Sequence, residues 1–262
     1  MLVPTREGRE SACTFPSSAW LQRIARIDVH GDTGTLRTAD AESVAIVLHG
    51  TLDLFAGGSA WARRGARTTP FDGRPVAVYL PPLTPYGSSD GDGALLFASV
   101  RQPPIRSIAD GREALARKPL LPLLGSGKAF DPTSGEWRPR ETFPDSPEAI
   151  LPRRIARLAT PGGTVVERVL GLDYKSRGLC VDETSLVRGV PLRFVPPHAP
   201  GYPSEAALWL EVDGELTVDG ALVPSDGVPR ALACSPDAMP ELRLERGRAY
   251  ALVVWAGAKP AT

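Results

Sequence analysis

The stretch Glu42-Ser-Val-Ala-Ile-Val-Leu-His-Gly50 opens the region that decides the fold, which runs from Ala41 to Val100. Short apolar segments follow one another there, and the glycines and prolines between them leave no room for a helix. Short strands with turn residues every roughly 8–12 positions are typical of an antiparallel sandwich or barrel. The strands expected in the first part of the chain are 19–29, 44–48, 52–55, 59–63, 75–80 and 94–100.

A second strand-rich region begins at Arg154, where pairs such as Asp213-Gly214 and Asp219-Gly220 favour the tight turns of hairpins. The stretch between the two regions, 102–150, has no strand pattern, and we interpret it as a connector with a short helix over 110–117. The strands expected in the second region are 155–159, 164–170, 179–187, 191–195, 206–212, 215–218, 230–234, 241–244 and 249–255.

The sequence therefore predicts an all-β chain of two antiparallel barrels. We place the first barrel at residues 1–104, an irregular linker with short helical turns at 105–151, and the second barrel at 152–262. A small barrel has an interior just wide enough for side chains or one small ligand. We therefore expect the function to depend on the side chains that point inward.

Composition excludes several classes of function. The 262 residues are 42% hydrophobic, and Lys+Arg and Asp+Glu both total 30, so no excess positive charge is available to bind nucleic acid. No apolar run approaches the roughly 20 residues that span a bilayer. Residues 1–10 mix Arg and Glu without the apolar centre of a signal peptide, so we expect a cytoplasmic protein without a membrane partner. The three cysteines lack the spacing of a zinc or redox site.

Several segments carry a resemblance to a known family. The segment that starts at Glu42, the pair Gly57-Gly58, Arg64-Gly-Ala-Arg67 and Phe71-Asp-Gly-Arg-Pro-Val-Ala-Val-Tyr79-Leu-Pro81 resemble the bicupin uronate isomerases. The resemblance is strongest to the 5-deoxy-glucuronate isomerases of inositol catabolism, with the 4-deoxy-5-keto-uronate isomerases as relatives. It covers residues 40–104 well and the remainder loosely. It implies two jelly-roll cupin barrels and an aldose–ketose isomerase that moves a proton between adjacent carbons of a sugar acid.

The resemblance also implies a divalent transition metal in the second barrel, held by three histidines and a glutamate. This chain has only His30, His49 and His198. The family segment Pro-Pro-His-x-His corresponds to residues 196–200, which keep His198 and place Pro200 at the second ligand position.

The other ligand positions of the family are occupied by different residues. The carboxylate corresponds to Glu205 or Glu211, and Glu241 or Asp237 lies where the last histidine is expected. In the first barrel, Tyr86 takes the place of a ligand histidine. Because the imidazoles are so few, we expect no cofactor, and a metal, if bound, would be held by His198, Glu205 and Glu241.

Two functions are consistent with these residues. In the first, His198, Glu205 and Glu241 are the catalytic groups of a uronate-type isomerase. A sugar acid is then bound by Arg193 and Arg243, whose guanidinium groups suit a carboxylate, and by the ring of Trp209. In the second, the chain is a metal-free, non-catalytic cupin that binds a small molecule or has a regulatory role. Strand pairing between subunits would give a homodimer in either case.

Overall fold

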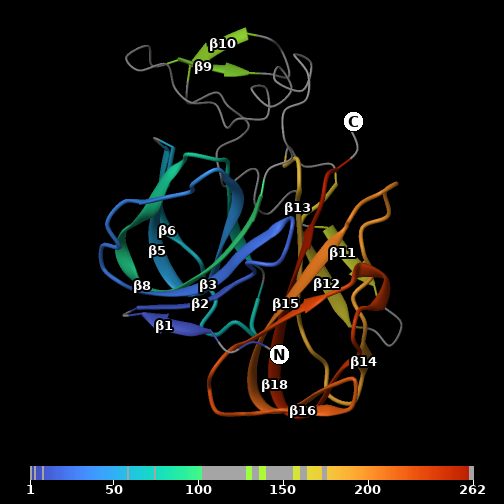
Figure 1. The fold of residues 1–262 in the computed structure, drawn as a ribbon. Coiled ribbons are helices and arrows are strands. Elements are labelled where there is room, and N and C mark those ends of the chain that lie inside the picture. The colour runs from blue at the N-terminus through green and yellow to red at the C-terminus, as the bar shows by residue number, and fades with distance from the viewer. Residues whose placement is uncertain are drawn as a thin grey trace.

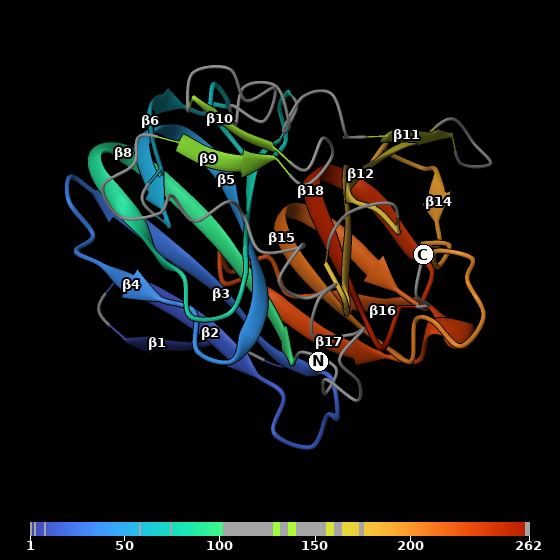
Figure 2. The ribbon, with the colours of Figure 1, turned by 90° about the horizontal axis from the view of Figure 1, so that it is seen from above.

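The computed structural model describes residues 2, 4–7, 9–57, 59–73, 75–101, 128–131, 136–139, 156–159, 164–172 and 176–259. Two antiparallel barrels lie side by side, the first coloured blue to green and the second yellow to red in Figures 1 and 2. The predicted all-β fold with two barrels is therefore confirmed. The predicted helix over 110–117 and the predicted domain limits at 104/105 and 151/152 lie outside the described residues.

The first barrel is an eight-stranded sheet in the order β1-β2-β3-β8-β5-β6, with β4 beside β8 and β7 beside β5. Its strands are β1 (Thr5–Glu7), β2 (Glu10–Thr14), β3 (Leu21–His30), β4 (Leu36–Arg37), β5 (Ala41–Ala56), β6 (Ser59–Arg64), β7 (Val76–Leu80) and β8 (Pro85–Arg101).

The second barrel repeats this topology, in the order β11-β12-β13-β18-β15-β16, with β14 beside β18 and β17 beside β15. Each strand of the first barrel therefore has a counterpart in the second. The strands are β11 (Ala156–Ala159), β12 (Val165–Leu170), β13 (Leu179–Ser185), β14 (Pro191–Leu192), β15 (Glu205–Val218), β16 (Ala221–Val223), β17 (Arg230–Cys234) and β18 (Leu242–Ala256). A 3-10 turn, η2 (Pro236–Ala238), precedes β18, and β9 (Lys128–Asp131) pairs with β10 (Glu136–Pro139) as a separate hairpin.

Four glycines allow long strands where the sequence predicted pairs of short ones. Gly50 of β5 lies opposite Gly93 of β8, and Gly214 of β15 lies opposite Gly247 of β18. Gly50 has a φ of +84°, and a Cβ there would lie 2.0 Å from the carbonyl oxygen of Asp92. A side chain cannot fit at such a crossing, so glycine lets the paired strands bend and continue. The predicted segments 44–48 and 52–55 are thus one strand.

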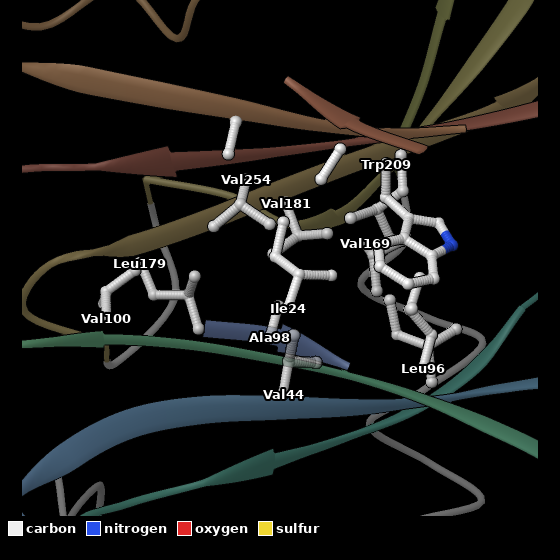
Figure 3. Close-up of a cluster of buried hydrophobic side chains, with 14 of the residues drawn as sticks. Ile24, Val44, Leu96, Ala98, Val100, Val169, Leu179, Val181, Trp209 and Val254 are labelled. Atoms are coloured by element: carbon white, nitrogen blue, oxygen red, sulfur yellow. The ribbon is translucent and has the colours of Figure 1, made fainter. Parts of the chain in front are cut away.

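The two barrels share an apolar core where their sheets face each other. Ile24, Val44 and Leu96 of the first barrel meet Val181 and Trp209 of the second in this layer, as Figure 3 shows. Two further apolar clusters lie inside the barrels, one containing Leu52 and Phe97 and the other containing Leu208 and Trp255. The sheets at the junction are therefore buried on both faces.

Two glutamates close the junction in a pseudo-symmetric way. Glu42 of β5 accepts hydrogen bonds from the backbone N–H groups of Arg177 (2.7 Å) and Gly178 (2.8 Å), just before β13. Glu205 of β15 accepts hydrogen bonds from the N–H groups of residues 19–21, at the start of β3, at 2.8–3.0 Å, and from the Ser18 hydroxyl. In each barrel, a glutamate at the start of one strand (β5 or β15) therefore binds the backbone at the start of a strand of the other barrel (β13 or β3). The two contacts are equivalent because β5 corresponds to β15 and β3 corresponds to β13.

The Glu205 contact predicts a measurable contribution to stability. Burial alone would raise the pKa of Glu205, but the hydrogen bonds from Ser18 and residues 19–21 outweigh burial and lower it, so the carboxylate is the preferred form. We expect Glu205→Gln to reduce the free energy of unfolding by about 1–3 kcal/mol, measured by urea denaturation at pH 7. Glu241→Gln, at an exposed position, is the matched control. Equal stability of the two variants would contradict a linking role for Glu205.

Candidate functional site

The structure does not bring the predicted catalytic residues together as a metal site. His198 and Glu241 are exposed, whereas the Glu205 carboxylate is held by the amides of the first barrel. Within the described ranges, no three His, Cys, Asp or Glu side chains are grouped so that they could hold a metal ion. The described residues therefore do not fit the metal site of the family, and the catalytic roles of His198, Glu205 and Glu241 stay predictions.

The predicted substrate-binding residues also lie apart from one another. Arg193 is exposed and donates to the carbonyl oxygen of Met239 at 2.7 Å. Arg243 forms an exposed ion pair with Glu245 at 3.0 Å. Trp209 lies in the shared core and faces the first barrel, not the interior of the second (Figure 3). Their proposed contacts with a sugar acid remain untested predictions.

An internal ion pair occupies the interior of the second barrel. Arg168 of β12 binds both carboxylate oxygens of Asp182 of β13, at 2.8 and 2.9 Å. The indole N–H of Trp255 donates to the same carboxylate at 2.9 Å, and Trp255 is fully buried. An arginine inside a barrel could bind the carboxylate of a ligand in a bidentate way. Arg168 instead makes this bidentate contact with Asp182, a residue of the protein itself.

Removal of Asp182 is expected to destabilise the second barrel strongly. Asp182 is 1% exposed, so Asp182→Ala would leave the charge of Arg168 without its partner inside the barrel. We expect the free energy of unfolding to fall by about 3–5 kcal/mol in a denaturant titration.

The control for this substitution is Asp213→Ala, which breaks the exposed pair between Asp213 and Arg248. That change is expected to cost less than about 1 kcal/mol. A similar small effect for both variants would show that the internal pair does not hold the barrel together.

The first barrel, in contrast, contains an open cavity of about 750 Å³. Such a volume lies within the range of small-molecule sites, roughly 300–1,000 Å³. The cavity lies between the β1–β2 hairpin and the inner faces of β3, β5 and β8. It is lined by Leu2, Thr5, Glu10, Ala12, Cys13, Thr14, Gln22, Arg23, Arg37, Thr38, Ala39, Ala41, Ser43, Tyr86, Phe97 and Ser99.

Strand pairing identifies positions at which the interiors of the two barrels differ. The pair Glu42–Val100 of β5 and β8 corresponds to the pair Glu205–Ala256 of β15 and β18, and this correspondence sets the two barrels in register. In that register Ser99 corresponds to Trp255, because Ser99 directly precedes Val100 and Trp255 directly precedes Ala256. Both side chains face the interior of their barrel.

The same register relates the neighbouring strands. Ala12 pairs with Ala25 in the first barrel, where Arg168 pairs with Asp182 in the second. Small side chains thus leave space in the first barrel at the positions where an ion pair and an indole fill the second.

A row of polar residues crosses the inner wall of this cavity. Arg23 of β3 pairs with Ser99 of β8, which pairs with Ser43 of β5. Ser43 is fully buried, and its hydroxyl has no hydrogen-bond partner within the described residues. A buried hydroxyl without a partner costs about 1–3 kcal/mol, and this one lies behind the surface of the cavity wall.

Charged and aromatic groups face the same space. Arg23 contacts Glu10 of β2, and both side chains are partly exposed on the cavity wall. Tyr86 stacks on Phe97 with ring centroids 5.2 Å apart. Burial raises the pKa of Tyr86 to about 12, while Arg23 lowers it and Glu10 raises it, so the phenol stays neutral. The arrangement can bind a polar small molecule and offers donors to an anionic group.

A separate polar cluster lies at the junction of the barrels. Arg26 of β3 bonds to Asp28 (3.0 Å) and to Glu211 of β15 (2.9 Å), and one of its nitrogens lies 3.4 Å from Nε2 of His49. Burial and the charge of Arg26 lower the pKa of His49, and Glu211, Asp28 and Asp92 partly oppose them. The neutral imidazole is therefore the form that fits the junction.

This arrangement predicts acid sensitivity. Because the folded pKa of His49 lies below the unfolded value of about 6.5, the unfolded chain binds more protons as the pH falls past that value. We expect the free energy of unfolding to decrease from pH 7.5 to pH 5 and to decrease less in His49→Gln. An unchanged pH slope in the variant would contradict this role of His49.

The sequence singled out Tyr86 in the first barrel but did not predict this cavity. The available signal was the size of the inward residues: strand 94–100 has Ser99 where strand 249–255 ends on Trp255. The β1–β2 hairpin, which forms one wall, was not predicted either.

Comparisons with known proteins agree with the fold. A search of curated proteins finds no match, whereas the KduI/IolB family model matches residues 20–102. An IolB-like protein of Salmonella typhimurium LT2 is 15% identical, with a TM-score of 0.60, and the alignment covers 98% of this chain and 92% of that chain. A bacterial pirin of Escherichia coli, solved with nickel(II), is 12% identical with a TM-score of 0.50 and coverages of 97% and 95%. Oxalate decarboxylase of Bacillus subtilis is 14% identical with a TM-score of 0.51 and coverages of 97% and 74%.

Proposed function

We propose that this chain, whose residues 20–102 match the model of the KduI/IolB family, is a metal-independent bicupin that binds a small molecule in the first barrel. The observation that carries this proposal is the cavity of about 750 Å³ at positions that the second barrel fills with its own side chains. In this proposal the second barrel is a support, and the two glutamates at the junction fix it to the first.

The family suggests a sugar acid as the first class of ligand to test. The KduI/IolB family is one of uronate and deoxy-glucuronate isomerases, and the cavity offers arginine, hydroxyl and aromatic groups to such a molecule. These groups bind carboxylates, hydroxyls and the apolar faces of sugars. No part of this recognition depends on the residues His198 and Glu241, which lie outside the cavity lining.

A blocked cavity tests the proposal. Ala12 lines the cavity from β2, and Ala12→Phe would fill part of its volume. We expect a sugar acid such as glucuronate to raise the melting temperature of the wild-type protein and to give a binding isotherm, and Ala12→Phe to lose both effects while still unfolding cooperatively. His198→Ala is the matched control and is expected to bind as the wild type does. Binding that survives Ala12→Phe would place the ligand outside the cavity.

Isomerisation is the second candidate, and the family match over residues 20–102 favours it. In that case the purified protein would hold a stoichiometric divalent transition metal and convert 5-deoxy-glucuronate to its ketose. Metal content and activity would both fall in His198→Ala. Metal analysis together with an assay of the same sample separates the two candidates, because a binding protein is expected to be inactive both as the wild type and as His198→Ala.

A further inference from the structure

Arg23 lies against Glu10 in the wall of the first-barrel cavity. Arg23 belongs to the row formed with Thr14, Ser99 and Ser43, whereas Glu10 lies four residues before Thr14 on β2. To reach Glu10, the guanidinium must extend over the pair Ala12–Ala25, whose small side chains leave room for it. The ion pair is therefore part of the wall that a ligand would contact.

We propose that Arg23 is the anion-binding residue of the cavity and that the Glu10 carboxylate competes with the anionic group of the ligand for Arg23. Glu10 thereby sets the affinity of the cavity for the anion. This inference rests on the proposed binding function and assigns roles within the same site. The ligand class is a small organic carboxylate with at least one hydroxyl group.

The donors of Arg23 are only partly used. A guanidinium has five N–H donors, and the contact of Arg23 with Glu10 involves Nη2. No other hydrogen bond of the Arg23 side chain occurs within the part of the chain that the structure describes. Both side chains are about a third exposed, 37% for Arg23 and 29% for Glu10, so the pair is reachable from the cavity. A ligand carboxylate can therefore approach Arg23, but it meets the negative charge of Glu10.

Thr14 supplies the second point of recognition. It lines the cavity at an exposed position and is paired with Arg23. One small molecule can therefore contact both residues, with its carboxylate at Arg23 and a hydroxyl group at the Thr14 hydroxyl, which gives the ligand class stated above.

The sign of one substitution is the main test. Glu10→Gln keeps the shape of the side chain and removes its charge, so it is expected to tighten the binding of glucuronate by roughly tenfold. Glucuronamide has the same size and no charge, and its affinity is expected to be unchanged by Glu10→Gln. Isothermal titration calorimetry at low ionic strength measures both, and Glu245→Gln, from an exposed ion pair on the second barrel, is the matched control.

Two further variants assign the partners of the ligand. Arg23→Gln is expected to weaken glucuronate at least tenfold and to leave glucuronamide within about twofold. Thr14→Val is expected to weaken both probes several-fold, since it removes a hydroxyl contact and no charge. Cooperative thermal unfolding of each variant shows that the barrel remains folded.

The outcomes separate this inference from the proposed function. Tighter binding of glucuronate by Glu10→Gln than by the wild type supports competition by Glu10. The same conclusion holds if Glu10→Gln binds measurably and the wild-type protein binds too weakly to measure. If glucuronate and glucuronamide bind equally, or if Glu10→Gln weakens the anion or leaves it unchanged, the inference is wrong while the binding function stands. If neither probe nor any neutral sugar binds to any variant, the proposed function itself fails.

Discussion

The apolar layer between the two barrels is the constraint on which the rest of the structure depends. Strands β3, β5 and β8 of the first barrel and β13, β15 and β18 of the second bury their outer faces against each other. At an order of 25 cal/mol per Å² of apolar surface, such a layer is the main source of stability for the pair. The layer has polar edges, where Glu42 and Glu205 accept backbone hydrogen bonds and Arg67 pairs with Glu183. These contacts fix the angle and register at which the barrels meet.

The architecture could be predicted from the sequence because turns and apolar runs repeat in both halves. Strand 75–80 of the prediction became β7, and strand 230–234 became β17 with the same limits. The bent strands were predicted as separate pieces because Gly50 and Gly214 have the sequence pattern of turns. Only the pairing with Gly93 and Gly247 shows that each glycine lies at a crossing inside a continuous strand.

The site could not be predicted to the same extent, for a physical reason. Residues 41–48 are all buried, so alternation along the strand does not distinguish the face toward the barrel interior from the face toward the other barrel. Trp209 was therefore expected inside the second barrel but lies between the barrels. Arg168 was visible in the sequence, but its partner Asp182 lies on the next strand and becomes evident only with the strand pairing.

The filled second barrel has a consequence for redesign of this fold. The Arg168 guanidinium and the Trp255 indole both donate hydrogen bonds to the Asp182 carboxylate there. Asp182 thus occupies the position that the carboxylate of a bound ligand could take. Substitution of Asp182 and Trp255 by small residues, by analogy with Ala25 and Ser99 of the first barrel, would leave Arg168 as a receptor for an added acid. One polypeptide thus contains two barrels of the same topology, one with a cavity and one in which Asp182 and Trp255 occupy the equivalent space.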